Sequence, residues 1–411
     1  MPDDDQRDSE KAPAPPRSGI RRALDFAWFL LKDQWFLVGI GVVTLIASQV
    51  QVPLAQQNVK QLVVSYLSVS LVFFVAGCTI DTSILLANYA KWKHHLFIQL
   101  QCFLMVSALA YAVVRLAAIS PSFMDPWLLI GMIFNGCQPT AMASNVQFTR
   151  QSHGETALTV VETTIGNLIG PFVTPVLIRM YLLPNTWFSA VIPSDQSNSY
   201  QALYSRVFMQ FGLSIYLPML LGQLFRHFFP KLTKTLFVDY KLSKIGSLCM
   251  LTLLWQTFDR AFATNAFNDV KSSNLVFIVF VTICNWSVWL LIAFGLSVLW
   301  LGRKETVAVV MCVPAKTLAL GMPLSFLMFE GISELEEAKI QVPMLIFQVE
   351  MLGLASISTL FFRRWVAKGE RKERARADEE GAVGGGGDGG RQEGGEKVVG
   401  VRASEKDDIP C

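Results

Sequence analysis

Ten long hydrophobic runs, separated by short polar stretches, make up most of the chain. A helix needs about 20 mainly apolar residues to cross the hydrocarbon core of a bilayer, and most of these runs are close to that length. We therefore predict an all-α polytopic membrane protein with ten transmembrane helices in a lipid bilayer. The expected spans are Trp35–Val50, Leu62–Cys78, Leu96–Leu116, Trp127–Phe148, Ala157–Leu182, Leu203–Phe225, Ile245–Ala263, Leu275–Leu301, Thr306–Phe329 and Val342–Trp365.

The distribution of charge strengthens this prediction. The chain has 67 Asp, Glu, Lys and Arg residues, and only 34 of them fall in the 331 residues from 35 to 365. Soluble domains carry roughly 25% charged residues. The deficit excludes a soluble enzyme, a secreted disulfide scaffold and a nucleic-acid binder. The sequence also has no catalytic constellation and no metal-ligand spacing, so we expect no enzyme activity, no cofactor and no metal site.

Lysine and arginine predict the orientation of the spans. The loops on the side of both termini hold Lys91, Lys93, Arg150, Arg226, Lys231, Lys234, Lys241, Lys244, Arg303 and Lys304. The opposite loops hold only Lys60, Arg260, Lys271 and Lys339. Because short basic loops stay in the cytoplasm, we expect both termini there. The outer loop Glu330–Glu337 is acidic, and we expect its carboxylates to be solvated.

The two ends of the chain differ in composition from the spans. Residues 22–34 are amphipathic and suit a short interfacial helix, and the Gly-rich end has too few hydrophobic residues to form a core. The predicted segments are a cytosolic N-terminal segment (1–34), a first five-helix repeat (35–182), an outer loop (183–202), a second five-helix repeat (203–365) and a disordered cytosolic tail (366–411).

Proline interrupts the fourth and ninth spans in a similar way. Pro139 and Pro314 lie in mid-membrane and are followed by small and polar residues. Proline removes a helix donor and clashes with the preceding turn, so each span is expected to kink or unwind there. Each is also the fourth of five spans, and an odd number of spans inverts the second half. This layout is typical of secondary transporters, whose solute site lies where the broken helices meet. The alternative is that both prolines make ordinary kinks.

Polar residues line the spans around these breaks. Thr156, Thr159, Thr163 and Asn167 share one face of the fifth span. Side-chain oxygens of this kind are suitable ligands for a hard monovalent cation. For any single Thr, the alternative is a hydrogen bond to its own preceding turn.

Three ionisable residues lie well inside spans: Glu162, Lys316 and Glu350. A charge at the bilayer centre costs roughly 2.5–3.5 kcal/mol on insertion scales, so none should face lipid. Our hypothesis is that the Lys316 ammonium replaces a bound cation at the break, with Glu162 or Glu350 as its partner. The alternative is a static ion pair that locks two helices together.

Several of these segments resemble the bile acid:sodium symporter family. The resemblance lies in Pro139–Val146, Ala157–Thr164, Gly170–Pro175 and Lys316–Pro323. The last segment is similar to the calcium-homeostasis-regulator branch, which includes the seventh member of the human bile-acid-carrier family and fungal plasma-membrane relatives. The resemblance implies a panel domain and a core domain with crossed fourth and ninth helices. It also implies that Ser144, Asn145, Thr159 and Thr163 match a first sodium site and that Gln101 matches a ligand of a second.

The ninth span departs from the sodium-coupled members of that family. They place a Glu before the crossing and a Gln-Asn pair at it, whereas Val310–Pro314 has no carboxylate and Lys316 follows. The resemblance therefore implies a plasma-membrane transporter that limits calcium influx without sodium coupling. The alternatives are a sodium- or proton-coupled symporter of a small organic anion, and a regulator that acts on a calcium channel or pump as its partner. A Golgi or other secretory-pathway membrane is the alternative location.

Overall fold

The computed structural model describes residues 35–79, 83, 90–183, 186–193, 205, 208–240, 242, 244–329 and 331–384. Within these ranges every regular element is helical. The expected interfacial helix at 22–34, most of the outer loop at 183–202 and residues 385–411 lie outside the described residues. The chain divides into two compact units, Met1–Val366 and Ala367–Cys411, and all contacts discussed below lie within the first.

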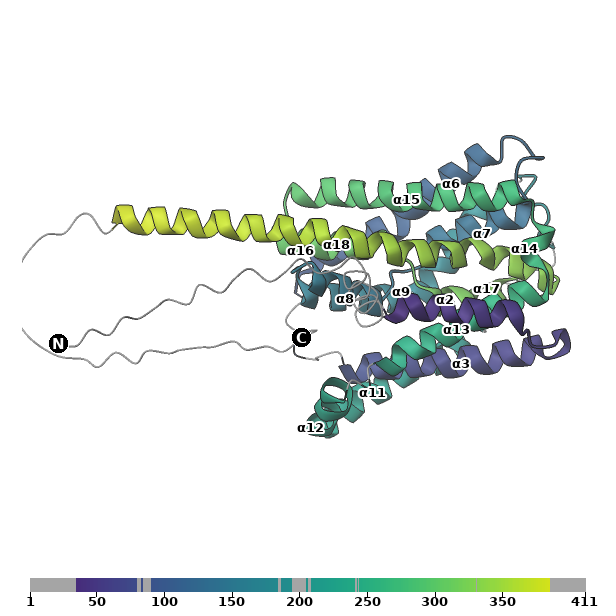
Figure 1. Cartoon of the computed structure of the whole chain (residues 1–411), viewed down its shortest axis with the longest axis horizontal. Helices are drawn as coiled ribbons and strands as arrows, with labels where there is room; N and C mark the ends of the chain where they lie inside the picture. The colour runs from purple at the N-terminus through teal and green to yellow at the C-terminus, as the bar shows by residue number, and fades with distance from the viewer. Residues whose placement is uncertain are drawn as a thin grey trace, which may run out of the picture. The chain divides into compact units, whose positions relative to one another are not determined.

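Helices cover most of the described residues in the expected spans, with interruptions at 138–142 and 313–317 (Figure 1). In chain order, the main helices are α2 (Trp35–Gln49), α3 (Leu54–Thr79), α5 (Trp92–Leu100), η1 (Gln101–Met105), α6 (Val106–Ala117), α7 (Pro126–Cys137), α8 (Ala143–Gln151), α9 (Thr156–Leu182), η3 (Gly212–Tyr216), α11 (Leu217–Phe228), α13 (Lys244–Ala263), α15 (Ser272–Val298), α16 (Arg303–Cys312), α17 (Leu318–Met328) and α18 (Glu334–Gly384). Short elements are α12 (Pro230–Thr233), η4 (Lys234–Asp239) and α14 (Ala266–Asp269).

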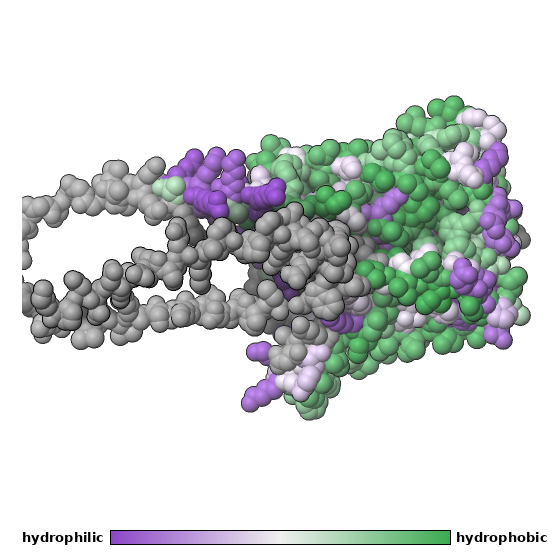
Figure 2. Space-filling view, viewed as in Figure 1, coloured by the Kyte–Doolittle hydropathy of each residue, from purple (hydrophilic) through white to green (hydrophobic). Residues whose placement is uncertain are grey.

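Six helices of the described chain are long and apolar enough to cross a membrane: Leu54–Thr79, Trp92–Ala117, Thr156–Leu182, Phe208–Phe228, Ser272–Val298 and Glu334–Glu373. Hydrophobic side chains cover the side of the bundle in view, and hydrophilic side chains gather at the end where α14 lies (Figure 2). Exposed apolar sides are expected when lipid, rather than water, surrounds the helices. The fold is therefore that of a polytopic helical membrane protein.

Helix α18 corrects one prediction. It does not end near Trp365 but continues to Gly384, so the expectation of a disordered tail from residue 366 is wrong for its first part. Residues 367–380 are mostly Ala, Lys, Arg and Glu, which are strong helix formers in water. The charge in this segment therefore does not prevent helix formation.

The helices pack in two groups. Helices α2, α3, α11 and α13 pack against one another, and α6, α7, α8, α9, α15 and α16 form a second connected group. Helix α17 contacts members of both groups. Residues Trp127–Cys137 of α7 and Thr306–Cys312 of α16 are buried throughout, so the second group has these helices at its centre.

Two glycines allow the backbones of α3 and α11 to touch. A Cβ atom at Gly77 would lie 2.3 Å from the Met219 carbonyl oxygen, and one at Gly222 would lie 2.4 Å from the Phe74 carbonyl oxygen. Both obstacles are backbone atoms, which cannot move aside as a side chain can. Small residues at such contacts are typical of helix packing in membranes.

We expect Gly77→Ala to destabilise the purified protein by about 1–3 kcal/mol, the usual effect of overpacking. A lower midpoint of thermal unfolding would measure the effect. Gly295→Ala is the matched control, because a Cβ at Gly295 of α15 meets nothing within 4 Å. Equal midpoints for the two variants would contradict the close approach of α3 to α11.

A buried polar network connects α3 and α13 to the first turns of α18. Arg260 Nη2 donates to Glu337 Oε2 at 2.9 Å, and Gln61 Nε2 donates to Glu337 Oε1 at 3.1 Å. Lys60 pairs with Asp259 in the same region. Arg260 and Glu337 are only 3% and 6% exposed. The expectation that Glu337 belongs to a solvated acidic loop is therefore wrong, because α18 starts at Glu334 and places this carboxylate against α13.

Candidate functional site

The fourth and ninth spans are both interrupted at their prolines. Helix α7 ends at Cys137 and α8 begins at Ala143, while α16 ends at Cys312 and α17 begins at Leu318. We call residues 138–142 the first break and residues 313–317 the second break. Pro139 lies in the first break and Pro314 in the second. Each break leaves backbone groups without their helical partners, and those groups need new ones.

The two breaks supply partners to each other. The Thr317 amide donates to the Pro139 carbonyl at 3.0 Å, and the Thr140 hydroxyl donates to the Cys312 carbonyl at 2.6 Å. Segments more than 170 residues apart in the sequence are thus joined by direct hydrogen bonds. Gln138, Thr140, Lys316 and Thr317 are each at most 5% exposed, so this conformation holds the breaks closed to solvent.

Lys316 lies in the second break and is held by backbone carbonyls. Its Nζ donates to the Cys102 carbonyl at 2.8 Å and to the Gln138 carbonyl at 2.9 Å. The same Nζ lies 6.0 Å from the ring centroid of Trp289, at the outer limit of a cation–π contact. Two carbonyl oxygens and one aromatic ring thus surround the ammonium, and groups of this kind would also suit a monovalent cation.

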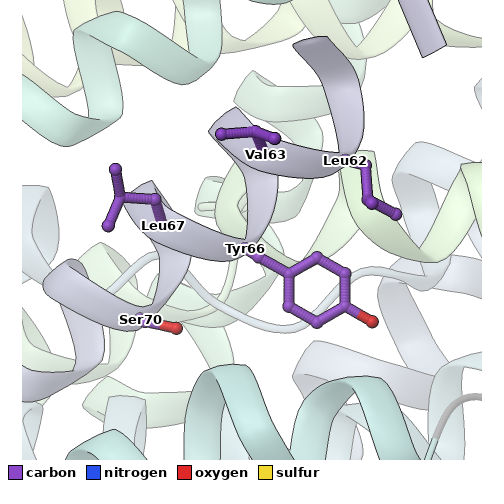
Figure 3. Close-up of a pocket in the computed structure, with 5 residues that line it drawn as sticks. All are labelled: Leu62, Val63, Tyr66, Leu67 and Ser70. Carbon is purple, nitrogen blue, oxygen red and sulfur yellow. The ribbon is translucent and has the colours of Figure 1, made fainter. Parts of the chain in front are cut away.

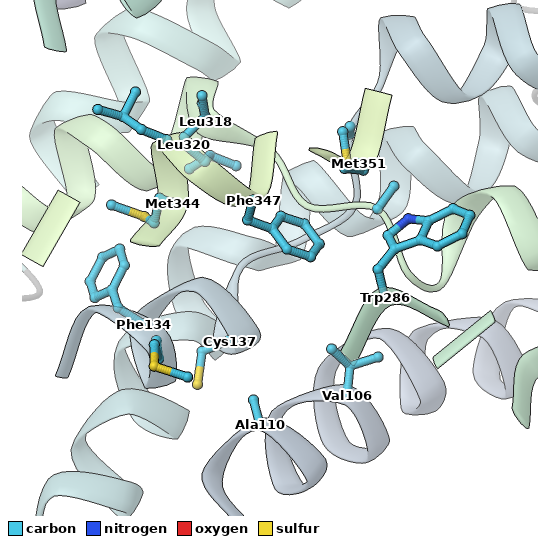
Figure 4. Close-up of a cluster of buried hydrophobic side chains, with 14 of the residues drawn as sticks. Val106, Ala110, Phe134, Cys137, Trp286, Leu318, Leu320, Met344, Phe347 and Met351 are labelled. Carbon is cyan, nitrogen blue, oxygen red and sulfur yellow. The ribbon is translucent and has the colours of Figure 1, made fainter. Parts of the chain in front are cut away.

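An apolar shell surrounds this charge. The Lys316 amide contacts the Met351 sulfur at 3.3 Å. Met351 belongs to the same buried cluster as Cys137, Phe347 and Val106, and Figure 4 shows these side chains between neighbouring helices. Electrostatic interactions are stronger in such surroundings than in water, so the two carbonyls and Lys316 hold one another firmly.

The prediction that Glu162 or Glu350 pairs with Lys316 is wrong. Glu162 does not pair with it but contacts His95 Nδ1 through Oε1. Glu350 accepts a hydrogen bond from the Thr282 hydroxyl at 2.5 Å and is half-buried on α18. The sequence suggested a carboxylate as the partner of Lys316. It could not show that the Gln138 carbonyl of the first break accepts a hydrogen bond from the ammonium.

His95, Gln99 and Glu162 form a second polar cluster next to the breaks. The Gln99 amide donates to the Glu162 carbonyl and to Glu162 Oε2, both at 2.9 Å. Glu162 is fully buried, and the His95 side chain is 12% exposed. This cluster was not predicted from the sequence. The available signal was the spacing of His95 and Gln99, which places both on one helix face.

The residues matched to a first sodium site are divided between two places. Asn145 donates to the Thr140 hydroxyl at 2.7 Å, and Asn167 donates to the Thr140 carbonyl at 3.0 Å, so both amides lie at the first break. Thr159 donates to the Thr149 hydroxyl at 3.0 Å, and Thr163 donates to the Thr159 carbonyl at 2.8 Å. Thr163 thus makes the hydrogen bond to its own preceding turn that was the alternative for any single threonine.

Ser144 and Gln101 also lie on elements beside the breaks. Ser144 is half-buried in the first turn of α8. Gln101 begins the π-helix η1, and its Nε2 donates to the Phe97 carbonyl at 3.4 Å. Its Oε1 has no hydrogen-bond partner among the described residues, and the same is true of Gln99 Oε1 and Gln138 Oε1. Three buried amide oxygens near the breaks are therefore available to a bound group.

A surface hollow lies away from the breaks. It is lined by Leu62, Val63, Tyr66, Leu67 and Ser70 of α3, and Figure 3 shows these side chains along one stretch of that helix. Leu62, Val63 and Leu67 are at least half exposed, so we assign the hollow to the lipid-facing surface. Within the described residues no group of three His, Cys, Asp or Glu side chains is placed to hold a metal ion.

Known proteins are similar to this chain over most of its length. Residues 34–364 match the model of the SBF-like CPA transporter family. "Solute carrier RCH1" of Candida albicans is 32% identical over 86% of this chain and 93% of the relative. Its namesake in Saccharomyces cerevisiae is 29% identical over 82% of this chain and 85% of the relative. "Sodium/bile acid cotransporter 7" of Mus musculus is 25% identical over 83% of this chain and 95% of the relative.

Proposed function

The chain belongs to the SBF-like CPA transporter family, and from this premise we propose that it is a secondary carrier of a small, anionic organic solute. The solute site lies at the two breaks, where helices α7–α8 and α16–α17 cross as the fourth and ninth of ten spans in two inverted repeats. The observation that carries the proposal is the direct hydrogen bond between the breaks, from the Thr317 amide to the Pro139 carbonyl. The helices that begin after the breaks, α8 and α17, direct the partial positive charge of their N-terminal ends toward this region, which suits an anion.

The two packing groups suit a carrier that moves by rocking. We assign α2, α3, α11 and α13 to a panel domain and the group around α7, α9 and α16 to a core domain. Both termini lie in the cytoplasm and the protein resides in the plasma membrane. The closed breaks correspond to an occluded state, from which rocking of the core against the panel would open the site to either side.

The carrier also takes part in calcium homeostasis, as a negative regulator of calcium influx. This part of the proposal is supported by the resemblance of Lys316–Pro323 to the calcium-homeostasis-regulator branch. If the protein moves no solute, it would regulate calcium influx by acting on a calcium channel or pump.

Cytosolic calcium after a pulse of external calcium tests the function. Cells that lack the protein should show a larger rise than cells rescued with wild type. Thr140→Val should rescue only in part, because it removes the hydroxyl that joins the first break to the Cys312 carbonyl at 2.6 Å while keeping the side-chain volume. Ser70→Ala, at the lipid-facing hollow, is the matched control and should rescue fully. Full rescue by Thr140→Val would make the crossing irrelevant to calcium.

Sodium coupling is the alternative, and the resemblance of Ser144, Asn145, Thr159 and Thr163 to a first sodium site favours it. We expect sodium to stabilise the purified protein no more than potassium does, since the Lys316 ammonium already engages the Cys102 and Gln138 carbonyls. The unfolding midpoint in sodium and in potassium chloride of equal ionic strength measures this. A sodium-specific rise that Thr163→Val removes would establish the symporter instead.

A further inference from the structure

A buried carboxylate whose histidine partner is partly exposed lies beside the crossing. Glu162 is fully buried on α9, and its Oε1 contacts His95 on α5. His95 is 12% exposed, and the neighbouring His94 is 19% exposed and lies 3.7 Å from Glu305. Lys91 lies at the same distance from Glu305 and is 39% exposed. A proton could therefore pass from solvent through this histidine end to Glu162.

Among the described residues, the Glu162 side chain contacts His95 and Gln99. Gln99 holds both the carboxylate and the carbonyl of Glu162 at 2.9 Å, which fixes the side chain in place. Other titratable or charged groups of the packed elements are the thiols of Cys102 on η1 and Cys312 on α16, and Lys316 beyond them. The Cys102 thiol lies 3.8 Å from the Cys312 carbonyl, and the Cys102 carbonyl accepts from Lys316 Nζ.

Two helices connect this pair to the crossing. On α5 and η1, His95 and Gln99 are followed on the same side by Cys102, whose carbonyl accepts from Lys316 Nζ at 2.8 Å. On α9, five residues after Glu162, the Asn167 amide donates to the Thr140 carbonyl at 3.0 Å. A change at the His95–Glu162 contact would thus be transmitted to both breaks.

We propose that His95 and Glu162 form a proton-binding site whose occupancy couples proton movement to opening of the crossing. The inference rests on the proposed function, and it names the coupling ion. When one proton is held between the ring and the carboxylate, the contact ties α5 to α9 and the breaks stay closed. When the proton leaves, a neutral ring faces a bare carboxylate, the tie weakens and the crossing opens to the cytosolic side.

Infrared difference spectra of the purified full-length protein, labelled with carbon-13 glutamate, test the site. Wild type should show a carboxyl band that changes with pH between about 5 and 8, the range in which histidine ordinarily titrates. Glu162→Gln should abolish this change, and His95→Gln should move the pH at which it is half complete. Glu305→Gln, which alters the half-buried carboxylate 3.7 Å from His94, is the matched control and should leave this change intact. Absence of a titrating band in wild type overturns the proposal.

Maleimide labelling of Ser144→Cys in liposomes tests the coupling, read at that residue by peptide mass spectrometry. The protein that carries only Ser144→Cys should be labelled more steeply with rising pH than the protein that also carries Glu162→Gln. The reactivity of the thiol itself changes with pH equally in both, so the difference reports the coupling. His95→Gln is the second variant should Glu162→Gln fail to fold. If labelling depends on pH equally in the Ser144→Cys protein and in both variants, the coupling is wrong, but the proposed carrier function is not contradicted. No labelling at any pH refutes alternating access itself, and with it the proposal.

Discussion

Replacing Lys316 by alanine is expected to abolish rescue of the calcium response and to lower the stability of the protein. The change removes the charged donor from the Cys102 and Gln138 carbonyls, which accept at 2.8 and 2.9 Å. Leaving a buried polar group without its partner costs about 1–3 kcal/mol, and here two carbonyls lose theirs. The cavity left by the side chain adds to this loss. Thermal unfolding of purified protein and the calcium pulse measure the two effects.

Two further variants separate charge from packing at this position. Lys316→Met keeps the volume of the stem but offers no donor, so it should restore part of the stability and none of the activity. Lys93→Ala removes an exposed lysine of α5 and should change neither measurement. A Lys316→Met protein that is more stable than wild type and fully active would remove Lys316 from the mechanism.

Breaking the Arg260–Glu337 pair from one side is expected to destabilise the protein by about 3–5 kcal/mol. Arg260→Met leaves a buried carboxylate that keeps only the amides of Gln61 and Gln341, each at 3.1 Å. Glu337→Met leaves a guanidinium whose Nε and Nη1 already have no partner among the described residues. Either change leaves an uncompensated charge away from water, and the unfolding midpoint of the purified variant measures the loss.

The double variant Arg260→Met/Glu337→Met should recover most of that stability, because two apolar side chains of similar size can replace a buried ion pair at little net cost. The exposed pair of Lys91 and Glu305, 3.7 Å apart, is the matched control. Its disruption by Glu305→Met should cost no more than about 1 kcal/mol. Additive losses in the double variant would show that the two residues do not compensate each other.

The parts of this fold that depend on local chemistry were predictable from sequence. Proline at 139 and at 314 removes a donor wherever it occurs in a helix, so the two breaks followed directly from their positions. The long apolar runs likewise predicted helices, since a lipid environment permits few other structures. The residue at which α18 ends was not predictable in this way, because charged helix formers continue a helix as readily as they end a span.

The partners of the buried charges were not predictable, because they depend on contacts between distant segments. Lys316 is satisfied by two carbonyls, which no sequence pattern marks, rather than by a carboxylate. Arg260 and Glu337 lie near the ends of expected spans. If a helix extends a few residues beyond its expected end, a charged residue that was assigned to a loop becomes buried between helices. His95 and Gln99 carried a usable signal in their spacing, but Glu162 is more than 60 residues away.

The π-helical turn η1 contains one residue more than an α-helical turn would at the same place. A relative with an uninterrupted α-helix here would be one residue shorter between Leu100 and Val106, and an alignment would need a gap in that interval. Without the gap, every position on one side of it is rotated by about 100° relative to its true equivalent. Any assignment of Gln101 as an ion ligand by counting along the chain would then select a side chain pointing in a different direction.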